Sequence, residues 1–397
     1  MNAGPLGTAA LAPAVQPAKG RGVGAADPRA LAAALSRYRA CDPARSRHEL
    51  LVTAVPFAAS WGLMAYALAS GVWAGVLLAV PTAAFLVRLF MIQHDCGHGA
   101  FLPGRRANDW IGRAIGVLTL TPYDEWRRTH ALHHAGSGHL GRRGVGDVAT
   151  LTVREYRALS RLGRLRYRAY RHPLVMFGMG PLYVFVLQHR FPDGPLRAGA
   201  GPWVSAMATN VAIAVLAAVS IALLGWPVFL AVQLPVVALA AAAGVWLFYV
   251  QHQFETTSWE EEGAWRFHEA ALEGSSHYDL PPVLRWFSAN IGLHHVHHLV
   301  SRIPFYRLPE VLRDFPELGN VNRLTLRASL ACPRLTLWDE DRRRLVSFAD
   351  EAAARGGCGP PAGRGGDAAS GADAVRAALP PSGLLRNDET RRIRRKD

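Results

Sequence analysis

The sequence has few cysteines and almost no lysine. Its 4 cysteines form no CxxC pair, which argues against a zinc ribbon or a disulfide framework and is typical of a reducing compartment. Lysine occurs only at Lys19 and Lys396, so arginine supplies nearly all of the positive charge. The N-terminus lacks a charged start followed by an apolar core, and we therefore expect no cleavable signal peptide.

The net charge of +14 is compatible with nucleic-acid binding, but the distribution of apolar residues favours a membrane. Half of the chain is hydrophobic, and these residues gather in long runs with almost no charge. The runs cover residues 50–70, 72–93, 203–224 and 227–250. Each is about 20 residues long, enough for a helix to cross the hydrocarbon core. The short turns at Ser70-Gly71 and Gly225-Trp226-Pro227 predict two helical hairpins, so we expect a membrane as partner and no nucleic acid.

The segments outside these runs differ in composition. Residues 1–28 and 351–397 are rich in Ala, Gly and Pro, and we expect disordered tails on either side of one membrane domain, 29–350. The pattern of apolar residues in 30–47 predicts a short amphipathic helix on the surface. Arg88 lies near the end of the second run, where its long side chain is expected to reach the membrane interface.

Three histidine clusters lie beyond the ends of the runs. Their spacings, i, i+4 or i, i+3, i+4, place the imidazoles of each cluster on one face of a helix and predict metal binding. The eight candidate ligands are His94, His98, His130, His133, His134, His294, His297 and His298. His252 directly follows the fourth run, as His94 follows the second, and is a candidate ninth ligand. His295 lies between ligand positions and is expected to point elsewhere.

The number and kind of these side chains limit the metal. Eight imidazoles exceed the needs of one tetrahedral zinc ion, and no cysteine cluster offers itself for an iron–sulfur centre. Imidazole binds iron, copper, nickel and zinc alike, but eight or more nitrogens suit two ions with positions left open. Two iron ions that activate oxygen are the best chemical interpretation. Carboxylates near the clusters are candidate hydrogen-bond partners of the imidazoles: Asp95, Asp124, Glu125, Glu255 and Asp279.

A shared site also constrains the topology. The second and third clusters must face the same side of the membrane, so an even number of spans must separate them, and the hairpin at 203–250 supplies two. We therefore expect the apolar segment 173–191 to be interfacial or re-entrant. Nine arginines lie between residues 142 and 171 with few acidic neighbours. The positive-inside rule then predicts that this loop, the metal site and both termini are cytoplasmic.

The pattern HxxxH, HxxHH, HxxHH, with a hydrophobic pair before the first and third boxes, resembles the membrane fatty acid desaturases. The resemblance covers over half of the chain and is closest to the acyl-lipid ω-6 (Δ12) branch of bacteria and plastids. It rests on His94-Asp95-Cys96-Gly97-His98, Gly112–Pro122 and Asn290–His298, and extends to Pro304, Tyr306 and Leu308. The expected fold is an all-α membrane protein, with four transmembrane helices in two hairpins and a cytoplasmic helical cap that carries the di-iron site.

The resemblance implies a non-haem di-iron enzyme of the bacterial inner membrane. Such an enzyme uses O2 and two electrons to remove two hydrogens from the acyl chain of a lipid, and the ω-6 branch converts oleoyl to linoleoyl chains. In that family one histidine outside the boxes joins the eight as an iron ligand, and His252 is our candidate. The sequence has no His-Pro-Gly-Gly haem signature, so we expect a separate electron donor, a ferredoxin, in place of a fused cytochrome b5 domain.

Two other functions are compatible with these residues. A membrane hydroxylase or ketolase acting on carotenoids, sterols or alkanes would share the oxygen-activating centre and differ in its product. A protein that only binds or transports metal would need no redox chemistry. Transporters place ionisable groups within their spans, whereas these histidines lie beyond the span ends. The form of the first box favours acyl desaturation.

Overall fold

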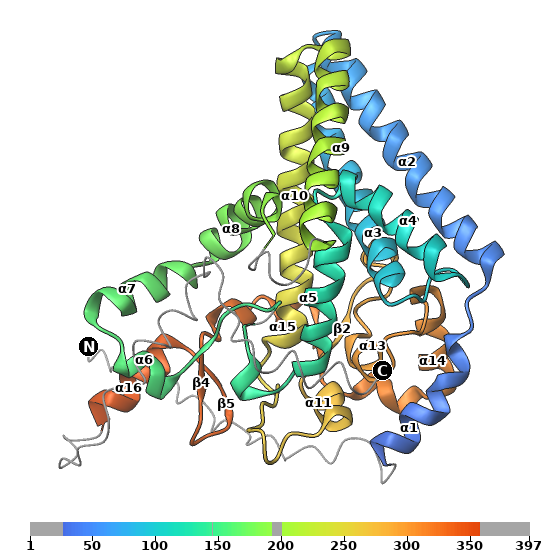
Figure 1. Cartoon of the computed structure of the whole chain (residues 1–397). Coiled ribbons are helices and arrows are strands. Elements are labelled where there is room, and N and C mark those ends of the chain that lie inside the picture. The colour runs from blue at the N-terminus through green and yellow to red at the C-terminus, as the bar shows by residue number, and fades with distance from the viewer. Residues whose placement is uncertain (1–26, 145, 193–200, 358–397) are drawn as a thin grey trace, which may run out of the picture.

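The structure is a computed structural model that describes residues 27–144, 146–192 and 201–357 (Figure 1). Most of the two tails expected at 1–28 and 351–397 therefore lies outside the described residues. The expected start of the C-terminal tail at 351 was wrong, because helix α16 covers Phe348–Gly357. Its Glu351 is buried and forms an ion pair with Arg157, which holds this last helix against the body of the protein, and a second pair within the helix with Arg355.

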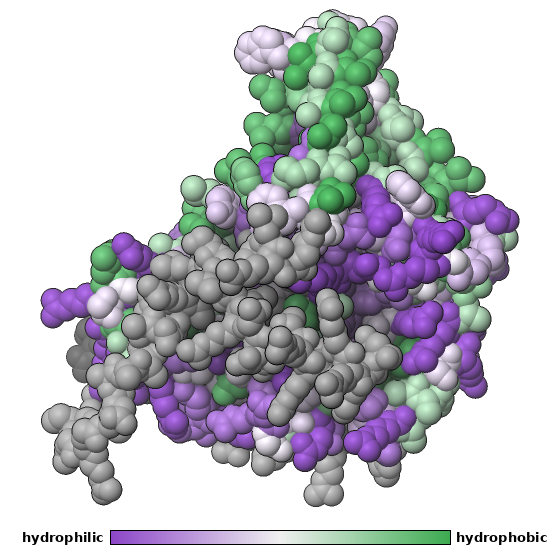
Figure 2. Space-filling model, viewed as in Figure 1, coloured by the Kyte–Doolittle hydropathy of each residue, from purple (hydrophilic) through white to green (hydrophobic). Residues whose placement is uncertain are grey.

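Four long apolar helices confirm the two expected hairpins. The first pair is α2 (Pro43–Ala69) and the span Trp73–Gly97, in which a 3₁₀ segment leads into α3 (Ala79–Gly97); the second pair is α9 (Gly201–Leu224) and α10 (Trp226–His252). Both hairpins rise from the same side of the body in Figure 1, and hydrophobic side chains cover them in Figure 2. Large apolar side chains such as Leu223 remain exposed there, as expected for a surface that faces lipid.

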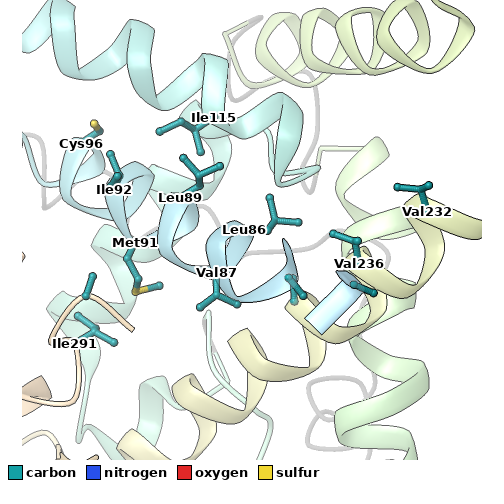
Figure 3. Close-up of a cluster of buried hydrophobic side chains, with 14 of the residues drawn as sticks. Leu86, Val87, Leu89, Met91, Ile92, Cys96, Ile115, Val232, Val236 and Ile291 are labelled. Atoms are coloured by element: carbon teal, nitrogen blue, oxygen red, sulfur yellow. The ribbon is translucent and has the colours of Figure 1, made fainter. Parts of the chain in front are cut away.

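Helix α3 lies at the centre of the largest hydrophobic core. Its side chains Leu86, Leu89 and Ile92 are buried against neighbouring helices (Figure 3). Ile115 of α4 (Arg105–Leu118) and Val236 of α10 belong to the same cluster. This packing fixes the end of α3, and with it the first histidine cluster, relative to the second hairpin.

Arg88 does not reach the membrane interface, so that expectation was wrong. Its side chain is only 2% exposed and forms a buried ion pair with Glu49 of α2. The guanidinium also donates to Thr53 Oγ1 (3.2 Å) and to the backbone carbonyl of Trp286, and it lies 3.9 Å from the centre of the Trp286 ring. A buried charge is tolerated when it is paired and its hydrogen-bonding groups are satisfied. The pair therefore connects both helices of the first hairpin to α12 (Pro282–Phe287).

The remainder of the described chain forms a mostly helical cap below the hairpins. Its other helices are α1 (Pro28–Leu35), α5 (Tyr123–Gly136), α6 (Val153–Ala158), α7 (Arg161–Tyr170), α8 (Gly180–Leu182), α11 (Phe267–Glu273), α13 (His294–Leu299), α14 (Leu308–Asp314) and α15 (Leu326–Ser329). Two small sheets, which the sequence analysis did not predict, complete it. In one, β4 (Leu337–Asp339) pairs in parallel with β1 (Leu151–Thr152) and antiparallel with β5 (Arg344–Val346); in the other, β2 (His277–Asp279) and β3 (Arg323–Thr325) are parallel.

The N-terminal helix is not a simple surface element. Residues 30–47, expected as one short surface helix, instead divide into α1, a 3₁₀ turn at Ser36–Arg39 and the start of α2. The side chains of Leu31 and Leu35 are buried in a cluster that also contains Val296 of α13. Helix α1 therefore shares a hydrophobic core with α13, which carries the third histidine cluster, and the apolar face of α1 is part of that core.

The segment expected to be interfacial forms helical turns that are not among the four long apolar helices. It consists of the wide turns Val175–Met179 and Tyr183–Leu187 on either side of α8. In Figure 1, α7 and α8 together lead away from α10 as an arm. Its interfacial position remains a prediction.

Candidate metal centre

Four helices bring the predicted ligands together. The end of α3 carries His94 and leads directly to His98, and the end of α10 carries His252. Helix α5 carries the second cluster, His130, His133 and His134, and α13 carries the third, His294, His297 and His298. All of them lie at the same end of the two hairpins, as the even number of intervening spans requires.

The nine histidines form two adjacent groups. One contains His94, His98, His130, His134 and His297; the other contains His133, His252, His294 and His298. Within each group the ring nitrogens that could bind a metal all lie within 4.8 Å of one another. The groups do not follow the clusters of the sequence, since α5 supplies two histidines to the first group and one to the second. Each group has enough donors for its own metal ion.

The spacing of the nitrogens tests whether a metal ion fits. Neighbouring Nε2 atoms lie 3.0 Å apart between His98 and His130, and 3.1 Å apart between His130 and His134. In the second group, His252 Nε2 lies 3.1 Å from His133 Nε2 and 2.9 Å from His294 Nε2. A metal–nitrogen bond of about 2.1 Å puts ligands at right angles about 3.0 Å apart and tetrahedral ligands about 3.4 Å apart. The spacing fits ions with more than four coordination positions better than tetrahedral zinc.

The surroundings keep the imidazoles in the form that binds metals. The candidate ligands are buried, apart from partly exposed His98. Burial, reinforced by the neighbouring imidazoles, holds the pKa of His130, His134 and His297 well below its usual value. Removal from water has the same effect on the pKa of the histidines in the second group that lie outside the spans. These rings are therefore neutral at pH 7, and a neutral imidazole can offer a lone pair to a cation.

One predicted carboxylate orients a candidate ligand. Asp95 Oδ1 lies 3.3 Å from His94 Nδ1, and its other oxygen accepts a hydrogen bond of 2.7 Å from the backbone N–H of Phe305. Asp95 thus fixes the ring of His94 and ties the first cluster to the segment after the third. The other candidates lie elsewhere: Asp124 pairs with Arg113, Asp279 with Arg323, Glu125 with Arg128, and Glu255 is exposed.

Three residues near the site escaped the sequence analysis. Trp126 stacks on His130 with ring centres 4.7 Å apart, and its position one helical turn earlier on α5 was an available signal. Phe248 contacts the rings of both His133 and His252. Asp147 lines a small cavity together with His133, and burial raises the pKa of its carboxyl group. No local spacing in the sequence marks Asp147.

His295 points away from both groups, as expected. Its Nε2 lies 2.9 Å from the backbone carbonyl of Leu318, and its ring lies beside that of His277. Immediately before the third cluster, Gly292 allows strand β2 to pass very close. A Cβ atom at Gly292 would lie 2.3 Å from the carbonyl oxygen of Tyr278, a distance that no side chain tolerates. Strand β2 therefore supports the start of α13 only because this residue is glycine.

Comparison with known proteins agrees with this arrangement. The fatty acid desaturase family matches residues 71–326, which include all nine histidines. A fatty acid desaturase of Bacillus subtilis is 44% identical over 300 residues, which cover 76% of this chain and 85% of the relative.

Two more distant relatives are acyl-lipid desaturases of Synechocystis sp. An sn-1 oleoyl-lipid 12-desaturase is 26% identical over 247 residues, 57% of this chain and 64% of the relative. An sn-1 acyl-lipid omega-3 desaturase (ferredoxin) is 27% identical over 254 residues, 59% of this chain and 66% of the relative. With more than half of its length matched and its histidine clusters inside the match, the chain belongs to the fatty acid desaturase family.

Proposed function

We propose that this fatty acid desaturase is a di-iron enzyme that introduces a cis double bond at the Δ12 (ω-6) position of an oleoyl chain carried by a lipid. The observation that carries the proposal is the convergence of nine imidazoles into two adjacent groups at one end of the membrane hairpins. Two ions in these groups would share one reaction space while each keeps its own ligands.

Iron is the metal that fits the chemistry. The nitrogen spacing of 2.9–3.1 Å favours ions with more than four coordination positions, and five donors in one group and four in the other then leave positions open for O2. When bound, two iron ions would supply the activation of O2; overall, O2 takes one hydrogen from each of two neighbouring carbons and, with two electrons and two protons from outside, is reduced to two molecules of water. The chain itself contributes the neutral imidazoles, the Asp95 carboxylate that orients His94, and a buried site that limits access of water.

The lipid substrate and the electron donor are supported by the relatives. The two Synechocystis proteins are acyl-lipid desaturases, and the name of one specifies ferredoxin. We infer that a separate ferredoxin reduces this enzyme as well. The arginine-rich loop between residues 142 and 171 supports a cytoplasmic position for the cap and the metal site, since positively charged loops stay on that side of a bacterial inner membrane.

Expression in a bacterial host that contains oleoyl lipids and a ferredoxin system tests the proposal. We expect linoleoyl chains to appear with the wild type and to be absent with His297→Ala, and mass spectrometry of derivatised lipids would locate the new double bond. Iron content, measured on the purified proteins, should fall in the variant. A new double bond at another position would overturn the Δ12 assignment but not the activity. A hydroxylated product, or unchanged lipids with iron bound and reduced ferredoxin present, would overturn the proposed reaction.

A further inference from the structure

A basic groove lies between α7 and α16, outside the metal centre. It has a volume of about 640 Å³ and is lined by Tyr156, Arg161, Arg164, Leu165, Arg168, Glu351, Ala352 and Arg355. Such a volume is in the range of sites that hold small ligands or lipid head groups. The groove does not include any of the nine histidines, so the desaturation site does not explain it.

The groove carries an excess of positive charge that the described residues do not neutralise. Four guanidinium groups line it together with one carboxylate, that of Glu351. Glu351 already binds Arg355 at 2.6 Å and Arg157, from outside the groove, at 2.9 Å. Arg161 and Arg164 have no ion pair with any residue in the described part of the chain. Clustered arginines with free donors are the usual device for binding phosphate groups.

The helix that carries these arginines also exposes large apolar side chains. Leu162 and Leu165 of α7 are 55% and 64% exposed, and Leu174 and Met179 further along the arm are 74% and 70% exposed. The arm continues to α10, where Phe177 contacts Trp246 and Tyr249 of the second hairpin. Figure 1 shows α7 and α8 leading outward from that hairpin. Arginines beside exposed leucines, on a segment attached to a membrane span, are typical of a helix in the interfacial plane.

We propose that the groove between α7 and α16 binds the phosphate group of an anionic membrane lipid, whose acyl chains lie along the exposed apolar side chains of the arm. The arginines select the negative head group, and the apolar side chains distinguish a lipid from free phosphate. Such a lipid would anchor α7 and α8 to the membrane surface. Through Glu351, it would also anchor α16, the last described helix. This inference does not depend on the metal or on the position of the double bond.

Lipid binding to the purified full-length protein tests the inference. Short-chain phosphatidylglycerol is titrated against the wild type and against the double variant Arg161→Gln/Arg164→Gln, with short-chain phosphatidylcholine and inorganic phosphate as comparison ligands. Each arginine near an anionic lipid strengthens binding by electrostatic attraction, and the loss of both should weaken phosphatidylglycerol binding by roughly 30-fold. We expect phosphatidylcholine and inorganic phosphate to bind much more weakly to the wild type.

A matched control removes the same charge elsewhere. Arg39→Gln/Arg302→Gln changes two exposed arginines outside the groove and should bind phosphatidylglycerol like the wild type. Equal losses in both double variants, or equal binding of phosphatidylcholine, would overturn the inference. Binding of inorganic phosphate as tight as that of the lipid would assign the groove to a free anion instead. If the groove variant does not fold, as judged by its melting temperature, the single variant Arg161→Glu provides the same comparison.

Discussion

Removal of Glu49 alone should destabilise the protein more than removal of Glu49 and its partner together. The Glu49 and Arg88 side chains are 3% and 2% exposed, so water does not screen the charge that remains when one is lost. Glu49→Gln removes the counter-charge and leaves the Arg88 guanidinium buried among neutral acceptors such as Thr53 Oγ1 and the backbone carbonyl of Trp286. Breaking a buried ion pair in this way costs about 3–5 kcal/mol in free energy of unfolding.

The structure also predicts that the two single variants differ. Glu49 has a second cation, since Arg45 lies 2.7 Å away with a side chain that is 55% exposed. Arg88→Met therefore leaves Glu49 partly compensated, and its cost should be that of the lost charged hydrogen bonds, about 1.5–3 kcal/mol. In Glu49→Gln/Arg88→Met no buried charge remains, and the double variant should be more stable than Glu49→Gln alone.

Equilibrium unfolding in mixed micelles, followed by tryptophan fluorescence, measures these differences. The exposed pair Arg37–Asp314, 3.5 Å apart, provides a control, because Arg37→Met should cost less than about 1 kcal/mol. If the double variant loses the sum of the two single losses, the charges do not compensate each other and the reasoning fails. Equal losses for Glu49→Gln and Arg88→Met would refute the role assigned to Arg45.

Three further predictions concern the metal centre. His252→Ala should lower the iron content of the purified protein by about half, because it removes one of the four donors of the second group. The control His295→Ala should leave the iron content unchanged. Equal iron contents in the two variants would contradict the grouping. Asp95→Asn should weaken iron binding by about 10–100-fold, since the amide orients His94 less well, and a competition titration with a chelator measures this affinity. The metal-free protein should lose stability as the pH falls below about 6.5. The buried histidines have lowered pKa values, so each ring binds no proton in the folded state but binds one in the unfolded state. Each ring therefore lowers the free energy of unfolding by up to about 1.4 kcal/mol per pH unit. The affected residues outside the spans are His98, His130, His133, His134, His294, His297 and His298. A melting temperature that rises on acidification between pH 7 and 5.5 would refute this.

The membrane architecture could be predicted from sequence because it depends on local properties. A run of about 20 apolar residues spans a bilayer whatever its neighbours are, and four such runs gave the two hairpins. Ligand candidates were also local, because i, i+3 and i+4 positions share one helix face. His130, His133 and His134 could therefore be identified without knowledge of the fold. The exclusion of His295 follows from the same periodicity.

Only the tertiary structure decided how these local elements combine. The division of α5 between the two groups depends on where α10 and α13 meet it, and no spacing within α5 contains that information. Arg88 shows the same limit: its burial requires Glu49 from another helix and Trp286 from the cap. Contacts between residues far apart in the chain depend on packing, whereas hydropathy and helical periodicity describe only neighbours. The sequence therefore determined the spans and the candidate ligands, and packing of the four helices decided which imidazoles share each group.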